Sequence, residues 1–411
     1  MPREAGDRQG PSRPEPSLSA DGRRRRLRIA LLIEDVSRGG GQERVLAELT
    51  PRLAARHDVH LFCLSVRDVD VSTVTVHGLG DLPLPMGLRA LWFLLVSSLV
   101  VRPSRFDVVL SQGGNSLASN FVLAHTTHRE RRRARLGRQP LFGHRPLWRR
   151  AWEALRDRVF IAMEGCAARR CRGRIIAVSR SVRDYFVREW RLPPDAVHIV
   201  PNGVDHEVFR PELRDEARPR VRSQLDLHDD EFVALFVGGL WVEKGLPEVM
   251  AALPRAQARP RLVVVGSGDR ERFAGIAEAL GVRDRVTFVP HVDRPQDYFA
   301  MADCLVHANP IEPFGLVLLE GAACGLPLLA TRSGAALELI EDGVTGYFIE
   351  RDPHSIAAGL DRIATAPRLR AAMRKAVHQR SLQFSWDRQA AEIEQLFLRL
   401  TEPAAAEEEL G

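Results

Sequence analysis

Short runs of aliphatic residues alternate with segments of helical periodicity along the first half of the chain. Residues 27–33 (LRIALLI) are apolar at nearly every position, as expected for a strand buried on both faces of a parallel sheet. A glycine-rich turn follows, and apolar residues then recur at helical spacing over residues 42–56. This alternation predicts a doubly wound α/β domain. Its further strands are expected at residues 59–66, 71–76, 106–110, 120–125, 174–178 and 197–200.

The same alternation starts again after a polar stretch rich in Arg, Asp and Pro at residues 206–230, which we interpret as a linker region. An amphipathic pattern near the end of the chain predicts a terminal helix. The strands of the second half are expected at residues 232–237, 261–265, 286–289, 304–308 and 326–330. The predicted organisation is a disordered leader (1–26), a first α/β domain (27–205), the linker region (206–230), a second α/β domain (231–384), the terminal helix (385–402) and a tail (403–411).

Composition agrees with a globular protein of more than one domain. The 411 residues are too many for one compact core, and 45% hydrophobic with 27% charged residues excludes disorder and a collagen-like fibre. The apolar run at 88–101 is too short to cross a bilayer, and residues 1–22 lack the apolar core of a secretory signal. We therefore expect a cytoplasmic protein. Its five scattered cysteines are expected to be reduced: Cys63, Cys166, Cys171, Cys304 and Cys324.

The formal net charge of +6 points to anionic partners, such as a nucleotide, a phospholipid surface or nucleic acid. Among the 59 basic residues only Lys244 and Lys375 are lysines. In a chain that otherwise uses arginine, the position of each lysine is informative.

Lys244 lies in the segment FVGGLWVEKG, residues 236–245. A predicted strand ends there in Gly238 and Gly239, and Lys244 and Gly245 then open a helix. Glycines allow backbone N–H groups to approach an anion, and the helix start and the lysine add positive charge, so a phosphate is the expected ligand. The spacing matches neither a P-loop nor a dinucleotide-binding fingerprint. The alternative is an ordinary strand–turn–helix connection with a solvated lysine.

Two glutamates, Glu312 and Glu320, lie on either side of a predicted helix start at residues 314–316, in the segment EPFGLVLLE. Glu320 would lie six residues inside that helix, roughly 9 Å along its axis. The arrangement suits a nucleotide sugar held in three places: Glu312 at the sugar hydroxyls, the free N–H groups at the diphosphate, and Glu320 at the ribose diol. The alternative is two solvated carboxylates, which the apolar neighbours of Glu320 disfavour.

Together these segments resemble the retaining GT-B glycosyltransferases of family 4, whose marks are a G-x-x-x-x-K-G loop and an E-x-x-x-x-x-x-x-E motif. The resemblance covers nearly everything from residue 27 to residue 400. Residues 106–205 are also similar in outline to lipopolysaccharide-core glucosyltransferases. Further matching motifs occur in the family's order: GGQERV at 40–45, PNGVD at 201–205, the Gly266–Gly268 turn, and EGAACGLPLLAT at 320–331.

The resemblance implies two Rossmann-like domains that face each other across a cleft, with a last helix that crosses back to the first domain. It implies a nucleoside diphosphate sugar as co-substrate, transfer with retention, and neither a metal nor another cofactor. Glu312 and His125 would act at the transferred sugar, with His128 as the rival of His125. The donor-binding residues it implies are Gly40, Gly41, Gly239, Lys244, Phe314, Gly315, Leu316 and Glu320.

One position departs from the family pattern. The family usually carries arginine where this chain has Gly239. A charge-assisted hydrogen bond is worth about 1.5–3 kcal/mol, so its loss would weaken donor binding about tenfold or more. Either another arginine compensates or the reaction is slow.

A basic stretch interrupts the first domain. Residues 129–158 hold eleven arginines against three acidic residues, interspersed with Phe142, Trp148 and Trp152. In the family this region, together with residues 88–101, carries acceptor surfaces, and mixed Arg and Trp suit an anionic membrane interface. A lipid-linked saccharide is the acceptor this would imply. The alternative is a solvated charged surface.

Three functions follow. The first is a retaining glycosyltransferase of the hexosyltransferase type that acts on a glycan or lipid-linked acceptor in cell-envelope synthesis. The second is a related nucleotide-sugar epimerase, or a hydrolase that uses Glu312 and Glu320 as its carboxylate pair. The third is a basic module that binds membrane or nucleic acid. This last function would leave the Lys244 loop without a purpose, and the chain shows no nucleic-acid-binding motif.

Overall fold

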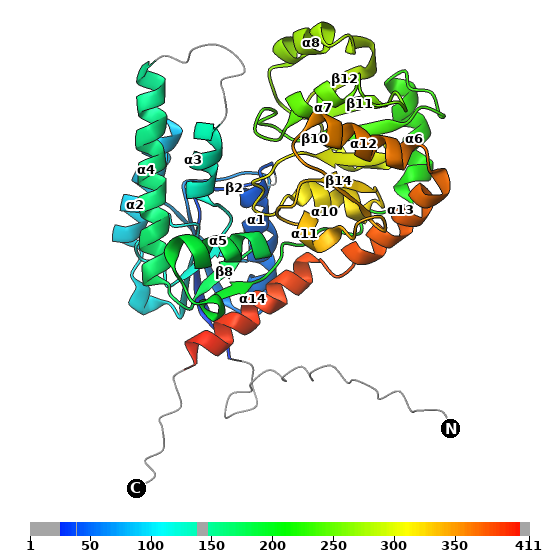
Figure 1. Ribbon diagram of the computed structural model, residues 1–411. Helices are drawn as coiled ribbons and strands as arrows, with labels where there is room; N and C mark the ends of the chain where they lie inside the picture. The colour runs from blue at the N-terminus through cyan, green and yellow to red at the C-terminus, as the bar shows by residue number, and fades with distance from the viewer. Residues whose placement is uncertain (1–24, 38, 138–146, 403–411) are drawn as a thin grey trace, which may run out of the picture.

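The computed structural model describes residues 25–37, 39–137 and 147–402. The predicted tail, and the predicted leader apart from Arg25 and Arg26, lie outside the described residues. The chain forms two α/β halves, each built on a parallel sheet (Figure 1). The predicted fold class, two Rossmann-like α/β domains, is therefore confirmed.

The first half contains a seven-stranded parallel sheet in the order β5-β3-β1-β6-β7-β8-β9. Its strands are β1 (Arg28–Leu32), β3 (Asp58–Cys63), β5 (Thr75–Gly78), β6 (Val108–Gln112), β7 (Phe121–Ala124), β8 (Ile175–Ala177) and β9 (Val197–Ile199). A short pair, β2 (Asp35–Val36) and β4 (Ser65–Val66), adjoins it. The strand order reverses between β1 and β6, and ligands of such sheets bind outside the carboxyl ends of the strands at this point.

Helices α1 (Gly41–Ala54), α2 (Met86–Val100), α3 (His128–Gly137), α4 (Leu147–Arg170) and α5 (Arg180–Trp190) belong to the first half, with 3₁₀ turns at Pro103–Arg105 and Pro194–Ala196. The aliphatic run of β1 is buried from Ile29 to Leu32, as a strand covered on both faces requires. The predicted strand at 71–76 is placed differently. Val71 and Val74 form a turn that packs on the core, and the strand begins only at Thr75, at the sheet edge.

The second half contains a six-stranded parallel sheet in the order β12-β11-β10-β13-β14-β15, which reverses between β10 and β13. Its strands are β10 (Val233–Val237), β11 (Arg261–Val265), β12 (Val286–Val289), β13 (Cys304–His307), β14 (Leu328–Ala330) and β15 (Gly346–Phe348). The helices are α7 (Leu246–Ala252), α8 (Arg270–Ala279), α9 (Pro295–Met301), α10 (Leu316–Ala323), α11 (Ala336–Leu339), α12 (Pro353–Ala364) and α13 (Pro367–Ser381), with a 3₁₀ turn at Arg283–Arg285.

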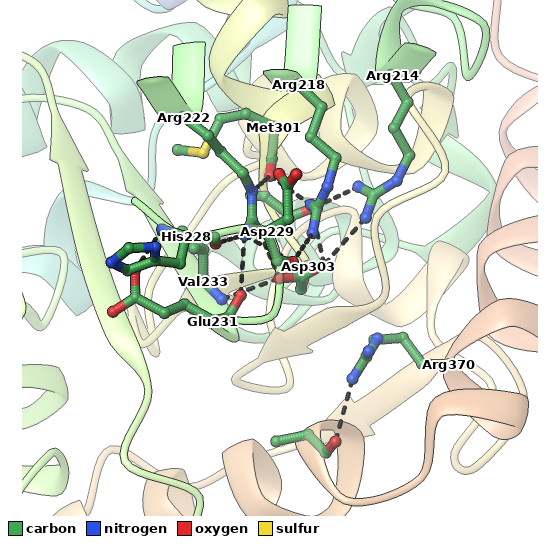
Figure 2. A network of polar contacts seen from close by, with 12 residues as sticks. Arg214, Arg218, Arg222, His228, Asp229, Glu231, Val233, Met301, Asp303 and Arg370 are labelled. Carbon is green, nitrogen blue, oxygen red and sulfur yellow. Dashed lines mark hydrogen bonds and ion pairs between the residues drawn. The ribbon is translucent and has the colours of Figure 1, made fainter. Parts of the chain in front are cut away.

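The segment 206–230, predicted to be a linker region, instead carries a packed helix, α6 (Leu213–Gln224). Three arginines spaced four residues apart on α6 converge on the carboxylate of Asp303, immediately before β13 (Figure 2). Their N–O distances are 3.0 Å from Arg214, 3.2 Å from Arg218 and 2.7 Å from Arg222. The helix is therefore part of the second half.

Arg222 explains why composition misled the prediction. Only 1% of this residue is exposed, and its guanidinium also donates to the carbonyl oxygens of Met301, His228 and Glu231. The helix also buries Leu213, Ala217 and Val221, but its many arginines and its proline outweighed this short apolar series, so the composition indicated a solvated segment. Burial of the arginines lowers their pKa, but Asp303 and the carbonyls supply partners for the charge.

The last helix, α14 (Trp386–Thr401), leaves the second half and lies along the first (red in Figure 1). Arg52 of α1 contacts Asp387 at 2.7 Å, and Arg56 contacts Glu394 at 3.0 Å. The ring of Phe397 packs edge-on against Phe121 of β7. The carboxyl-terminal helix thus ties the two halves together, as the resemblance implied.

None of the helices in the described part of the chain combines the length and the apolarity that a membrane span requires. All five cysteines are free, and Cys166 alone among them is not fully buried.

Candidate functional site

The loop after β10 folds its lysine back onto its glycines. Gly238 has φ 130°, and a Cβ atom there would lie 2.5 Å from Nζ of Lys244. Gly245 has φ 86°, and a Cβ there would lie 2.6 Å from the carbonyl oxygen of Ala308, just past β13. Both positions therefore require glycine. The ammonium group of Lys244 consequently lies at the carboxyl end of β10, beside the switch point of the sheet.

Glu312 lies in the loop that follows β13. Its Oε2 accepts hydrogen bonds from Nε2 of His307 at 2.9 Å and from Nδ2 of Asn309 at 3.0 Å. Burial alone would raise the pKa of Glu312, but His307, Lys244 and Asn309 outweigh burial and lower that pKa to about 2. Glu312 is therefore an ionised hydrogen-bond acceptor at neutral pH. The sequence analysis missed His307 and Asn309. His307 lies near the end of the strand predicted at residues 304–308, and Asn309 directly follows that strand.

Glu320 lies inside α10, and only 7% of it is exposed. The helix begins at Leu316, after Gly315 with φ 85°, so a helix start does lie between the two glutamates as predicted. Burial raises the pKa of Glu320, while Arg44 and Lys244 act to lower it. Such a buried carboxylate does not fit the alternative of a solvated surface charge.

Arg44 is the cation that pairs with Glu320. Its Nη1 lies 2.6 Å from Glu320 Oε1, although 276 positions separate the two residues in the sequence. Arg44 comes from the first turns of α1, and its guanidinium also lies over the ring of Phe209. The sequence analysis quoted Arg44 within a motif but gave it no role.

The loop that holds Glu312 is also held by the first half. The hydroxyl of Ser179, which caps α5, donates to the carbonyl oxygen of Pro313 at 2.5 Å. The N–H of Gly334 donates to Ser181 Oγ at 3.3 Å. Phe314 is buried, and its carbonyl oxygen accepts from the N–H of Ala335. Loops at the carboxyl ends of the two sheets therefore touch each other here.

Gly40 and Gly41 lie at the same place. Gly40 caps α1 and Gly41 is its first residue. The carboxylate of Glu43 folds back over Gly40 so closely that a side chain at position 40 would collide with it. Gln42, which follows Gly41, directs its side-chain amide to the carbonyl oxygen of His125. The glycine loop, Arg44 and His125 thus share one end of the first sheet.

His125 follows β7 and is buried. Within the described residues its Nε2 has no hydrogen-bond partner. Burial lowers the pKa of His125 to about 3, so the imidazole is neutral at physiological pH. A neutral ring can hydrogen-bond a sugar hydroxyl but is too weak a base to hold a proton near pH 7. The rival, His128, bonds Thr126 Oγ1 at 3.1 Å and stacks on Phe160, which indicates a structural role.

Gly239 leaves room where the family usually has arginine. A Cβ atom at this position would have one neighbour, the carbonyl oxygen of Ser267 at 3.4 Å. Its φ is not positive, so a side chain there meets neither backbone strain nor a clash.

Glu34 is a half-buried carboxylate that the sequence analysis did not consider. It follows β1, and burial raises its pKa to about 7. Arg89 acts to lower that pKa, whereas Asp35 and Glu43 act to raise it. Arg89 is itself bonded to both oxygens of Asp35, so it compensates Glu34 only in part. The sequence did contain a signal for this residue, because Glu34 directly follows the buried strand predicted at residues 27–33.

Across the described ranges, no three His, Cys, Asp or Glu side chains are grouped in a way that could hold a metal ion.

Comparison with known sequences adds two family matches. Residues 217–380 match the family described as "Glycosyl transferases group 1", and residues 39–208 match "Glycosyltransferase Family 4". The chain is also 36% identical to a D-inositol 3-phosphate glycosyltransferase of Acidothermus cellulolyticus over 210 residues, which is 47% of this chain and 46% of that protein. The chain spans about half the length of the curated relatives it matches.

Solved structures share the fold. WaaG, a glycosyltransferase involved in lipopolysaccharide biosynthesis, superimposes with a TM-score of 0.73 at 20% identity, over 89% of this chain and 98% of WaaG. HepE of Anabaena, solved with UDP and glucose, gives a TM-score of 0.68 at 18% identity, over 92% of this chain and all of that one. At these identities the likeness establishes the fold.

Proposed function

This chain belongs to the group 1, family 4 glycosyltransferases, and on that premise we propose that it is a retaining enzyme of the hexosyltransferase type. It moves a sugar from a nucleoside diphosphate sugar to a glycan or lipid-linked acceptor in cell-envelope synthesis. The UDP and glucose bound by HepE and the lipopolysaccharide role of WaaG support this choice of donor and acceptor class.

One observation carries the proposal. The ammonium group of Lys244 folds back over Gly238, and its charge acts to lower the pKa of both Glu312 and Glu320. One cation and two carboxylates, from two loops and helix α10, are thus close enough to bind one ligand. A nucleoside diphosphate sugar has the matching parts: a diphosphate for the cation, and two sets of hydroxyl groups for the carboxylates.

The donor would lie across the second half. Glu320 binds the ribose diol, and Lys244 with the N–H groups of Phe314, Gly315 and Leu316 binds the diphosphate. Glu312, ionised and oriented by His307 and Asn309, accepts hydrogen bonds from the transferred sugar. From the first half, Gly40, Gly41 and the neutral ring of His125 approach the donor from the other side.

This arrangement favours the breaking of the bond between the sugar and the diphosphate. The transition state carries positive charge on the sugar and new negative charge on the leaving phosphate, so a fixed ammonium and N–H groups at the diphosphate stabilise it selectively. The departing phosphate accepts the proton of the acceptor hydroxyl, and that oxygen bonds the sugar on the face the phosphate leaves. No metal and no further cofactor is required.

We place the reaction in the cytoplasm, at a membrane. Five free cysteines suit a reducing compartment. The arginine-rich α3 and α4 give the first half a basic surface suited to an anionic membrane. Part of the basic stretch, including Phe142, lies outside the described residues.

The hydrolase alternative is less well supported. A glycoside hydrolase requires one carboxylic acid that is protonated and free to donate near neutral pH. The pKa of Glu312 is lowered to about 2, and Glu320, the other candidate, has an oxygen bound to the guanidinium of Arg44 at 2.6 Å. A basic binding module would not need the Glu312 hydrogen-bond set.

Calorimetry with UDP, GDP and ADP, followed by assays for transfer from the matching sugar nucleotides, tests the proposal. Lys244→Ala and Glu320→Ala should each lose nucleotide binding and transfer, with the fold intact by circular dichroism. Lys375→Ala is the matched control, because the only other lysine is an exposed residue of α13. If no nucleoside diphosphate binds, or if Lys244→Ala behaves like Lys375→Ala, the proposal is wrong.

A further inference from the structure

A second concave site lies in the first half, between α3, α4 and α5. It is a pocket of about 290 Å³, and its lining includes Arg129, Arg132, Arg158, Arg169, Gly165 and Trp190. None of the residues of the nucleotide-sugar site lines it. The two sites therefore differ in position and in composition.

The wall of this pocket is fixed. Trp190 donates from its indole N–H to the buried carboxylate of Glu164 at 2.7 Å. The ring packs so closely on Gly165 that a side chain at position 165 would collide with it. The guanidinium of Arg129 lies 3.9 Å from the centre of the same ring and donates to the carbonyl oxygen of Glu189. One arginine is thus held in place by stacking and hydrogen bonding.

The other three arginines have no counter-charge. In the described part of the chain, no carboxylate forms an ion pair with Arg132, Arg158 or Arg169. By contrast, the exposed Arg133 and Arg188 of the same half are both paired with Glu189. Several unpaired guanidinium groups around one pocket repel each other, and a ligand with several anionic oxygens would remove that repulsion.

Two exposed leucines lie one helical turn beyond lining residues of the pocket and outside its lining. On α3, Leu136 follows Arg132 by one turn on the same side of the helix, and it is 71% exposed. On α4, Leu155 precedes Arg158 by three residues, and it is 52% exposed. An ion pair between Arg135 and Asp157 holds these turns of α3 and α4 together. Two exposed leucines therefore flank the same end of a cationic pocket.

We propose that this pocket, with Leu136 and Leu155 at its rim, binds the phosphate of an anionic membrane phospholipid. The arginines take the phosphate oxygens, and the two leucines enter the apolar layer beneath the headgroups. A free phosphate compound would use the arginines but would leave the leucines exposed. The lipid is therefore the ligand that accounts for both features. This inference rests on the membrane location proposed above and names the lipid site, but it involves no residue of the nucleotide-sugar site, so the two can be tested separately.

Vesicle co-sedimentation tests the proposal with the full chain. Vesicles of phosphatidylcholine are compared with vesicles that also contain phosphatidylglycerol, for the wild type and for Arg132→Gln/Arg158→Gln. Each arginine near an anionic surface contributes about fivefold to binding, so the double variant should lose about twentyfold or more. The matched control is Arg255→Gln/Arg270→Gln, which removes the same charge from exposed positions of the second half. It should bind like the wild type.

The leucines separate a lipid from a soluble ligand. Leu136→Ser/Leu155→Ser should weaken binding to the anionic vesicles, and the binding that remains should still depend on phosphatidylglycerol. Two results would overturn the proposal. The first is an equal loss of vesicle binding in the pocket variant and in the arginine control. The second is that glycerol phosphate displaces the wild type from the vesicles while the leucine variant binds them normally. The second result would identify a soluble phosphate ligand. Nucleotide calorimetry and thermal unfolding of the same variants, expected to be unchanged, show whether a loss is specific to the membrane.

Discussion

Arg44 of α1 and Glu320 of α10 form an ion pair of 2.6 Å that joins the two halves of the molecule. Glu320 is the carboxylate proposed to bind the donor ribose, so a residue of the first half sets the charge of a donor-binding group in the second. Both side chains are largely buried, 20% and 9% exposed, and solvent screens such a pair little.

Arg44→Ala should weaken the binding of a nucleoside diphosphate about tenfold. Without Arg44, Glu320 keeps its burial and loses the largest influence that lowers its pKa, so it takes up a proton more readily. A protonated carboxyl group is a poorer acceptor for a diol. Calorimetry should show that the defect grows as the pH falls. Arg52→Ala, on the same helix but paired with Asp387, is the control. Unchanged affinity in Arg44→Ala would show that the ion pair is not part of the donor site.

Gly239→Arg should strengthen nucleotide binding about tenfold. The position has a permitted φ, and a Cβ atom there would have one neighbouring atom at 3.4 Å, so the backbone accepts a side chain at this position. We expect an arginine there to add a cation beside Lys244. A charge-assisted bond to the diphosphate is worth about 1.5–3 kcal/mol. The same substitution should restore part of the affinity that Arg44→Ala loses. Gly239→Leu, which adds bulk without charge, should bind no better than the wild type, and a gain in that variant would contradict the electrostatic explanation.

Glu34→Gln should stabilise the protein above pH 7 and leave its stability unchanged near pH 4. The folded-state pKa of Glu34 is about 7, against 4.5 for an ordinary glutamate. Between these two values the folded chain binds more protons than the unfolded chain, so the wild type loses stability as the pH rises. The difference reaches at most about 3 kcal/mol above pH 7. Urea unfolding at pH 4 and pH 8 measures it, and an equal effect at both pH values would exclude titration of Glu34 as the cause.

Asp303→Asn should destabilise the second half by about 3–5 kcal/mol. The change leaves the guanidinium groups of Arg214, Arg218 and Arg222 without their carboxylate (Figure 2). Removing one partner of a buried ion pair is strongly destabilising, because the remaining charge is kept from water without a counter-charge. Asp387→Asn is the control, since that carboxylate is 85% exposed and its pair with Arg52 is worth about 1 kcal/mol or less. Similar unfolding midpoints for the two variants would show that Asp303 is not the centre of the cluster.

Residues of the proposed nucleotide site that share a local motif could be identified as candidates from the sequence. Lys244 follows two glycines at the end of a buried strand, and Glu312 and Glu320 stand on either side of a helix start. In each case the chemistry depends on neighbours within about ten positions. His307 and Asn309 are equally local, but nothing in their spacing shows that their side chains turn toward Glu312.

The aliphatic periodicity by itself determined the two parallel α/β halves, because strands covered on both faces must be apolar along their whole length. It also located the terminal helix and the glycine turns at which a ligand can approach the backbone. The tertiary structure alone decided what depends on charge pairing between distant segments. Arg44 meets Glu320 across 276 positions, and Arg222 of α6 is buried against Asp303, 81 positions further along the chain. The sequence does not distinguish a charged residue that is solvated from one that is paired, because only folding brings the partner within a few ångströms.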